Sequence, residues 1–365
     1  MIKAHKRERE RERINSLTES VDKSKVAAFG GERNMGEIGK MEERAAGNIV
    51  SIDTGKTRSY VVVEEHGKIT REGYTETSKE GFAEFISGVK DPTMIIETSS
   101  CFNGILNMIE DYGKVVAAYP FKVRLIAESV RKTDKIDAHT LKDLYKADYL
   151  PESYVPPKRI RELRELCHDR ASLVEEATAL KNRLRYKMFS HGFSVKTFSR
   201  INMAVLKTNA FTAVMAGGLA DVGSRIKELD VKIGEEAKRF RYAELIDTIP
   251  GIGEYSALAI AAEISDISRF KDAEHLEAYA GLVPRIYQSG NTEIRGHIVK
   301  GNKYLKTLLV ECVRIHIMHC PDSWITRSYR RIAQNAGKKK AAIAAAKRLL
   351  RTIYLMLIED RRYHP

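Results

Sequence analysis

The region from residue 48 to residue 150 alternates between the hydrophobic period of strands and that of helices. Apolar runs typical of strands occur in NIVSID (48–53), SYVVVEE, HGKITREGYTE, TMIIET (93–98) and KVVAAYP (114–120). Helical spacing occurs in KEGFAEFISGV and GILNMIEDYG. The predicted order is three strands, a helix, a strand, a helix, a strand and a final helix.

This order begins as a meander and continues as βαβ units. It predicts an α/β fold, in which helices cover a mixed sheet, in the ribonuclease-H-like layout. Because the carboxyl ends of parallel strands lie at the same edge of a sheet, polar residues that end such strands are expected to converge there.

A long helical period follows in residues 158–240. Apolar residues recur in 3-4 alternation and are Leu163, Leu166, Leu173, Ala177, Leu180 and Leu184. Residues 224–240 have the pattern of a returning helix. We predict an all-α module, either an antiparallel hairpin or an oligomeric coiled coil, that makes the chain a homodimer or higher homo-oligomer. The alternative is a helical packing domain with no role in dimerisation.

Four segments result from these patterns. Residues 1–47 have mixed charge and neither period, which predicts a disordered or non-native tail. They are followed by an α/β domain at 48–157, the coiled-coil module at 158–240 and a helical C-terminal domain at 241–365.

Charge is segregated along the chain. The sequence has 62 Lys and Arg against 49 Asp and Glu, a formal charge of +13. Residues 285–365 alone hold 17 basic and five acidic residues, so nearly all of the excess lies there. This distribution favours a partner with a phosphate backbone, DNA or RNA, over a merely solvated helix face.

Composition also excludes some classes of protein. No stretch of about 18 uncharged apolar residues occurs, and the chain opens on charged residues, so we expect neither a membrane protein nor a secreted one. The four cysteines are scattered, which is not typical of a disulfide framework. We expect a cytoplasmic, nucleoid-associated protein.

Acidic residues fall at informative places in the α/β domain. Asp53 and Glu97 close two predicted strands, and Asp134 and Asp137 lie three apart at the start of a helix, on one of its faces. Four carboxylates that converge repel one another unless cations neutralise them, and oxygen ligands suit Mg²⁺. The pattern predicts a two-metal site for phosphoryl transfer. Taken singly, each acid fits an ordinary strand end or N-cap.

The C-terminal domain contains a candidate phosphate-binding turn and a candidate nucleophile. The segment LIDTIPGIGEYSALAIAAEI (245–264) resembles a helix-hairpin-helix element, with Gly251 and Gly253 exposing backbone amides; a plain helix turn is the alternative. Ser289 lies in a glycine-containing basic segment, where a hydroxyl can attack phosphate if a base or metal deprotonates it. From the residues alone, a role as a turn residue is favoured over that of a nucleophile.

Basic side chains surround both features and continue to the C-terminus. The residues predicted to contact nucleic acid are Gly251, Gly253, Arg285, Arg295, Lys300, Lys303, Lys306, Lys338, Lys339 and Lys340. The amphipathic helix expected at 338–358 also directs Lys347, Arg348 and Arg351 toward nucleic acid, with its alanine-rich face in the core.

Several of these blocks resemble a known family. SIDTGKTRSYVVV, IIETSSCFNGILNMIEDYG and VRKTDKIDAHTLKDLY are similar to the D, E and DxxD blocks of DEDD-type insertion-sequence transposases, whose first domain resembles the Holliday-junction resolvase RuvC. The C-terminal stretch RFKDAEHLEAYAGLVPRIYQSG and the later GHIVKGNKYLKTLLVE are similar to the last domain of the same "one-ten" group. The group is also described as bridge-RNA-guided recombinases.

The resemblance implies a function and a mechanism. Ser289 would attack a DNA phosphodiester and form a phosphoserine, while Mg²⁺ bound by Asp53, Glu97, Asp134 and Asp137 assists. From the helical module we add the hypothesis that two paired chains combine the Ser289 of one with the carboxylates of the other. A structured guide RNA would choose donor and target DNA by base pairing. The alternatives are a Mg²⁺-dependent junction-resolving nuclease with water as nucleophile, and a non-enzymatic DNA-binding protein.

Overall fold

The computed structural model describes residues 43–44, 46–126, 133–192, 210–289, 292–298 and 301–364, with backbone alone for 210–211 and 284–298. The chain divides into two compact units, Met1–Val155 and Pro156–Pro365. The predicted tail at 1–47 lies almost wholly outside the described residues. Within them, no helix combines the length and the apolar character needed to cross a membrane.

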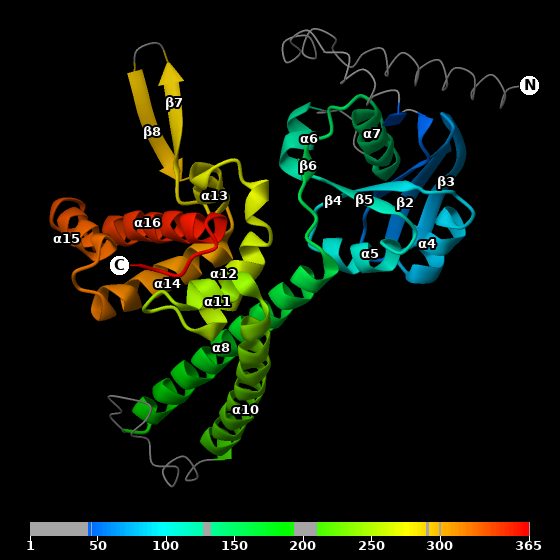
Figure 1. Ribbon diagram of the computed structural model, residues 1–365. Helices are drawn as coiled ribbons and strands as arrows, with labels where there is room; N and C mark the ends of the chain where they lie inside the picture. Colours follow the sequence, from blue (N-terminus) through cyan, green and yellow to red (C-terminus); the bar gives the residue numbers. More distant parts are fainter. Residues whose placement is uncertain are drawn as a thin grey trace, which may run out of the picture. The chain divides into compact units, whose positions relative to one another are not determined.

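The first unit is built on a six-stranded sheet in the order β3-β2-β1-β4-β5-β6 (Figure 1). Strand β1 pairs antiparallel with β2 and parallel with β4, and β5 continues the parallel half. The strands are β1 (Ile49–Asp53), β2 (Arg58–Glu65), β3 (Lys68–Glu76), β4 (Thr93–Glu97), β5 (Lys114–Ala118) and the short β6 (Glu152–Ser153).

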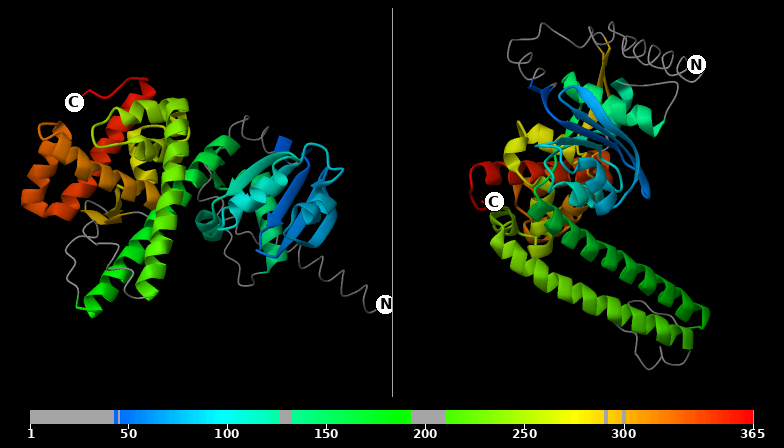
Figure 2. Two further views of the ribbon diagram at one scale, coloured as in Figure 1. Left: turned by 90° about the horizontal axis from the view of Figure 1, so that it is seen from below. Right: turned by 90° about the vertical axis from the view of Figure 1, so that its right-hand side faces the viewer.

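Helices cover both faces of this sheet. On one face, α4 (Lys79–Ile86) and α5 (Phe102–Ile109) pack on the alternate strand residues that include Val50 and Ile96. On the other face, α6 (Pro120–Ile126) and α7 (Asp134–Lys146) pack on the intervening residues. The predicted α/β sandwich around a mixed sheet is therefore confirmed, as Figure 2 also shows.

A buried ion pair attaches α7 to the sheet. Glu64 of β2 is almost fully buried and accepts from Lys142 of α7 at 2.9 Å and from Lys146. Burial alone would raise the pKa of Glu64, but the two lysines outweigh it and lower that pKa. Ser51 of β1 adds a hydrogen bond to the carbonyl oxygen of Ala138 at 2.6 Å. Helix α7 is thereby fixed over β1 and β2.

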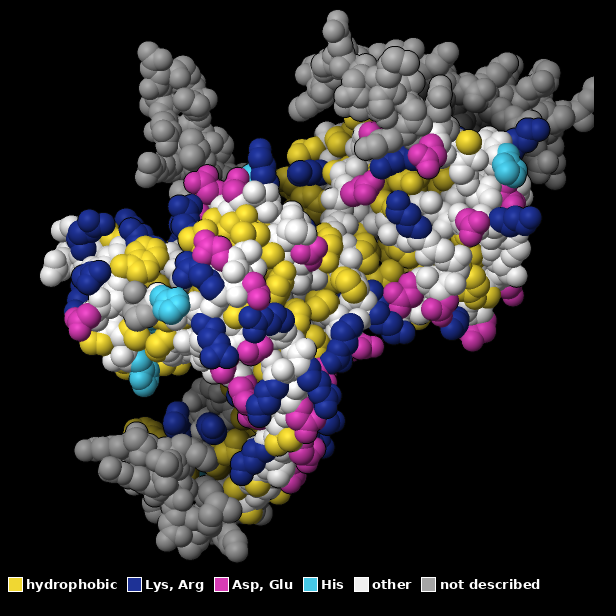
Figure 3. Space-filling view, in the orientation of Figure 1, with side chains coloured by type: hydrophobic (Ala, Val, Ile, Leu, Met, Phe, Trp, Pro, Cys, Tyr) yellow, Lys and Arg dark blue, Asp and Glu magenta, His cyan; other side chains and the backbone are white. Residues whose placement is uncertain are grey.

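The second unit begins with two long helices, α8 (Lys158–Ser190) and α10 (Ala210–Arg239), which lie side by side (Figures 1 and 2). Leu184 and Met188 pack against Met215 and Ala216. Acidic and basic side chains interleave over this helical hairpin (Figure 3). Helices α8 and α10 of the same chain therefore pair with each other. The formation of a dimer through this module stays a prediction.

The rest of the second unit contains a buried helix, α12 (Glu254–Ile264). Every residue of α12 from Ala257 to Ile264 is buried, so this helix is enclosed on all sides. The elements of this part are α11 (Arg241–Asp247), η2 (Ile267–Arg269), α13 (Ala273–Tyr279), β7 (Pro284–Ser289), β8 (Thr292–Ile298), α14 (Lys303–His319), α15 (Trp324–Ala336) and α16 (Lys338–Ile358).

The contact of α16 with nucleic acid stays a prediction. Lys347 and Arg351 both pair with Glu277 of α13, which is fully buried. The distances are 3.2 Å from Lys347 and 2.8 Å from Arg351. A carboxylate without solvent needs such partners, since an unpaired buried charge is strongly destabilising. These two cations therefore hold α13 against α16.

Candidate functional site

Two of the predicted carboxylates lie at adjacent strand ends. Asp53 is the last residue of β1 and Glu97 the last of β4, and the parallel register aligns Ile52 with Ile96. Asp53 and Glu97 follow that pair, so their backbones are separated by one strand spacing, about 4.8 Å. Both alternate with residues that face α7, namely Ser51 and Ile95. The two side chains therefore leave the sheet on the same face.

The other two carboxylates lie in the first turn of α7, above that face. The hydroxyl of Thr133 caps this helix by accepting from the amide of Ile136 at 3.3 Å. The hydroxyl of Tyr74 donates to Asp134 at 3.2 Å. The sheet register aligns Asp53 with Tyr60 and Tyr60 with Tyr74. Asp134 is thus held over β3, two strands from Asp53.

This geometry bears on the predicted metal site. Among the described residues, no group of three or more His, Cys, Asp or Glu side chains is placed closely enough to hold a metal ion. Asp53 and Glu97 supply carboxylate oxygens from neighbouring strand ends, the donors that Mg²⁺ prefers. Asp137 is half-buried in the same helical turn as Asp134. The carboxylate oxygens of Asp53 and Glu97 fit Mg²⁺. The hydrogen bond from Tyr74 holds Asp134 over β3, away from these two strand ends.

The predicted nucleophile lies at the end of a strand in the second unit. Ser289 is the last residue of β7 and pairs with Thr292, the first residue of β8. Arg285 and Arg295 lie on the two strands of this hairpin, and Lys300 lies outside the described residues.

The base of the hairpin is closed by backbone contacts. A Cβ atom added to Gly301 would lie 2.4 Å from the backbone nitrogen of Gly281, so the chain passes too close for any side chain there. The amide of Asn302 donates to the carbonyl oxygen of Tyr279 at 2.8 Å. The ends of the hairpin are therefore held together at one point on the unit.

The remaining predicted cations lie in the first turns of helices. Lys303 is exposed and Lys306 half-buried at the start of α14, and Lys338, Lys339 and Lys340 are exposed at the start of α16. Positive charge at a helix N-terminus opposes the helix dipole. These lysines therefore cost a little stability, and they lie at helix ends that would bind an anion favourably.

The glycine turn between α11 and α12 has a packing role. Gly251 has a φ of +94°, and a Cβ atom on it would lie 2.5 Å from the backbone nitrogen of His316 in α14. The buried imidazole of His316 also hydrogen-bonds the carbonyl oxygen of Pro250 at 2.8 Å. The tight turn follows from its contact with α14. Gly253 is exposed at the N-cap of α12, and phosphate binding there stays a prediction.

Two transposase family models match the chain. A DEDD transposase model of the IS110 type matches residues 50–190, and the model described as the transposase IS116/IS110/IS902 family matches residues 243–330. Together they span more than half of the chain, including the strand-end carboxylates and Ser289. The chain belongs to the IS110 family of transposases.

Relatives of this transposase come from several bacteria. A probable family 20 transposase of Pseudomonas aeruginosa is 29% identical over 268 residues, which are 67% of this chain and 79% of the relative. The transposase for insertion sequence element IS1111A of Coxiella burnetii is 28% identical over 250 residues, 64% and 68% of the two chains. A pilin gene-inverting protein of Moraxella bovis is 34% identical over 123 residues, 33% and 38%.

A buried carboxylate, absent from the sequence predictions, anchors the Ser289 hairpin of this transposase. Glu263 of α12 is 4% exposed and accepts from the side-chain amide of Asn302 at 2.6 Å. It also bonds the imidazole of His168 in α8 at 2.8 Å. Asn302 in turn caps α14 by accepting from the amide of Leu305 at 2.9 Å. The hairpin base, α8, α12 and α14 thus share one acceptor.

The sequence indicates the roles of Glu263 and Tyr74 to different degrees. Glu263 is an acid within the alanine-rich run of α12, a pattern that indicates a buried and paired carboxylate. Tyr74 lies in an otherwise polar strand and gives no such signal, because its partner Asp134 is 60 residues away.

Neutralising either strand-end acid should stop catalysis without unfolding the protein. We expect Asp53→Asn and Glu97→Gln each to lower DNA strand cleavage by about 10²–10³-fold, the effect of losing a ligand to catalytic metal. Cleavage is measured on DNA that carries the element ends, with thermal unfolding as a check. Glu84→Gln, an exposed acid on α4 on the opposite face, is the matched control. Wild-type cleavage by either variant would contradict the assignment.

The stability of the second unit should depend on Glu263 at acid pH. Burial alone would raise the pKa of Glu263, but the hydrogen bonds from His168 and Asn302 and the positive charge of Arg164 outweigh it and lower that pKa. A lowered carboxyl pKa stabilises the fold above its ordinary value of 4.5, and this stabilisation is lost as the pH falls below it.

We therefore expect Glu263→Gln to cost about 1–3 kcal/mol in free energy of unfolding at neutral pH. The difference from the wild type should shrink as the pH is lowered from about 6 to about 3. Denaturant titrations at several pH values measure it. A difference that stays constant over this range would show that the charge of Glu263 is not responsible.

Proposed function

We propose that this transposase cuts and rejoins DNA through a covalent intermediate on Ser289, assisted by Asp53, Glu97, Asp134 and Asp137. The observation that carries the proposal is the alignment of Asp53 and Glu97 at the carboxyl ends of two adjacent parallel strands. Membership of a DEDD transposase family supports reading these acids as the first two of the four carboxylates.

The fold of the first unit supports a RuvC-like assignment. Its sheet places an antiparallel meander, β1 to β3, next to two strands that run parallel to β1. This arrangement suits the ribonuclease-H-like layout that the sequence predicted. In such a sheet the carboxyl ends of β1 and β4 form one crevice, which suits a phosphodiester bound between acidic residues and metal.

The proposed reaction has two balanced steps. Ser289 loses its proton and its oxygen attacks the phosphorus of a DNA strand; the phosphorus–oxygen bond to the leaving nucleoside breaks, and that oxygen takes up a proton. A hydroxyl of another DNA end then attacks the phosphoserine, restoring the Ser289 hydroxyl. Because no water enters, the bond energy is conserved for rejoining. Two Mg²⁺ ions held by the carboxylates would stabilise the attacking and leaving oxygens.

The position of Ser289 supports this role. It ends one strand of a two-stranded hairpin, at the end away from the base, and that base is held on the helical unit by close backbone contacts. Precise placement of a nucleophile is worth several orders of magnitude in rate. Glu263 and Asn302 act here as positioning residues.

Guidance by a structured RNA and pairing of chains complete the proposal. The C-terminal quarter is strongly basic, and the sequence contains no zinc-finger array to read bases, which suits target choice by base pairing. Exposed apolar side chains on α8 and α10, Tyr186, Phe189, Val214 and Val231, suit a dimer through the 158–240 module, with the Ser289 of one chain serving the other.

A covalent adduct is the decisive test of the mechanism. On end-labelled DNA carrying the element ends, denaturing gels should show labelled protein for the wild type, and mass spectrometry should place the nucleotide on Ser289. Ser289→Ala should abolish both adduct and cleavage, because no other group supplies the nucleophile. Ser268→Ala, a distant hydroxyl bonded to Asp266, is the control. Cleavage that survives Ser289→Ala would instead identify a nuclease that uses water.

RNA should accompany the protein from cells. We expect material purified at low salt to release a discrete RNA on phenol extraction, since phosphate contacts survive at low ionic strength. Sequencing of that RNA should map it beside the transposase gene. Protein that is free of RNA, yet fully active on DNA with element ends, would overturn RNA guidance and leave the Ser289 chemistry unaffected.

A further inference from the structure

The surface of α15 and the start of α16 carries positive charge without acidic compensation. From Ser323 to Ile358 the sequence has nine Lys and Arg and no Asp or Glu. Lys347 and Arg351 pair with Glu277, and Arg351 also pairs with Glu274. Among the described residues, no salt bridge neutralises the exposed Arg327, Arg330, Arg331, Lys338, Lys339 or Lys340. Figure 3 shows Lys and Arg side chains gathered over α15.

The cations on α15 share one face with an aromatic ring. Trp324, Arg327 and Arg331 are spaced by three and four residues, which places them on the same side of the helix. The buried residues Ile325, Thr326 and Ser328 of α15 contribute to the unit. Trp324 is 40% exposed although an indole is normally well buried. The helix therefore presents a large flat ring among positive charges.

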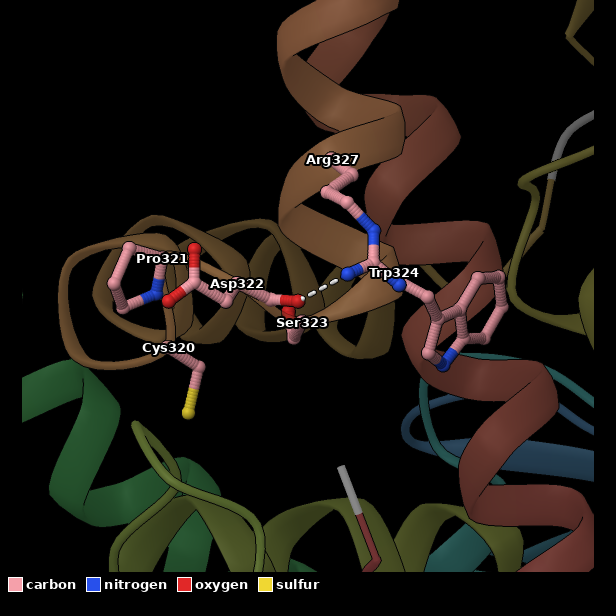
Figure 4. A pocket seen from close by; sticks show the side chains of 6 residues that line it. All are labelled: Cys320, Pro321, Asp322, Ser323, Trp324 and Arg327. Carbon is pink, nitrogen blue, oxygen red and sulfur yellow. Dashed lines mark hydrogen bonds between the residues drawn. The ribbon is translucent and has the colours of Figure 1, made fainter.

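The ring is held in place from α16. The guanidinium group of Arg348 lies over the indole, 5.7 Å from its centroid, in cation–π geometry. Trp324 also lines an open pocket of about 380 Å³ between the end of α14 and the start of α15. The other lining residues are Cys320, Pro321, Asp322, Ser323 and Arg327 (Figure 4). This volume is at the lower end of the range for small-ligand sites.

The pocket is rigid on its inner side. The hydroxyl of Ser323 is 3.0 Å from the imidazole of the buried His316 and caps α15 by accepting from the amide of Thr326 at 3.1 Å. Arg327 donates to the carbonyl oxygen of Asp322 at 2.8 Å, shown as a dashed line in Figure 4. That acceptor carries no formal charge, so the positive charge of Arg327 is not cancelled. The turn that carries Trp324 is fixed before any ligand arrives.

We propose that this surface binds an unpaired nucleic-acid strand, with one base stacked on Trp324 and the phosphates held by the cations of α15 and α16. An exposed indole adds little to the binding of a regular duplex, whose bases are already stacked. It suits a strand with free base faces, since aromatic stacking accepts every base. The inference rests on the proposed function, because strand exchange and guide RNA both supply unpaired nucleotides.

Trp324 is the only tryptophan of the chain, so tryptophan fluorescence reports on this site alone. We expect quenching when the purified transposase, stripped of RNA, is titrated with single-stranded DNA or RNA oligonucleotides. A strand of the same length without bases, or a blunt duplex, should quench little. The DNA and RNA arms show which strand the surface prefers. Equal quenching by the abasic strand would overturn base stacking.

Affinity measurements on variants separate stacking from charge. With labelled single strands, Trp324→Leu should weaken binding by roughly 5- to 100-fold and Trp324→Tyr should restore most of it. Changing Lys338, Lys339 and Lys340 together to Gln should lower the slope of log affinity against log salt by about 2. The matched control replaces Lys227, Lys232 and Lys271, also exposed, by Gln and should leave affinity and slope nearly unchanged.

The outcome is independent of the Ser289 chemistry. Unchanged affinity in a folded Trp324→Leu protein would overturn the proposal that this surface binds unpaired strands, even if the covalent adduct on Ser289 forms. Stacking at Trp324 without any adduct would support binding at this surface and contradict the proposed Ser289 mechanism.

Discussion

The parallel pairing of β1 with β4 is the constraint on which the candidate chemistry depends. Antiparallel neighbours would carry Asp53 and Glu97 to opposite edges of the sheet, whereas parallel neighbours in this register end together. The alternation of residues along each strand places both side chains on the face that α7 covers, and the buried pair of Glu64 with Lys142 holds α7 on that face.

In the second unit, the main structural feature is a hairpin whose base is held on a bundle of helices. A single acceptor, Glu263, joins α8, α12 and the residue that caps α14. Its environment makes the carboxylate form the stable one, because several donors converge on it away from water. The hydrogen bond from Asn302 to Glu263 and the close backbone contact at Gly301 thus both lie at the base of the hairpin.

Much of the first unit could be predicted from the sequence, because its signals are local. Alternating apolar residues located the strands, and Asp53 and Glu97 stood out as acids at strand ends. The long-range partners were beyond such reasoning: Tyr74 with Asp134, and Glu277 with Lys347 and Arg351, join residues 60 or more positions apart. A charged residue on an amphipathic helix looks solvent-facing until the acid that pairs with it is located. The glycine of the α11–α12 turn was predicted for its backbone freedom, but its contact with α14 was not visible.

The closed base of the β7–β8 hairpin has a consequence for how such a protein can vary. No side chain fits at Gly301, so the direction in which the strands start is fixed by main-chain contact. The length of the two strands can still vary. Adding a residue to each strand would carry the terminal serine about 3.4 Å further out and turn it to the other face of the ribbon. Only additions in pairs would preserve its orientation, so related proteins that keep the same chemistry should differ here in even steps.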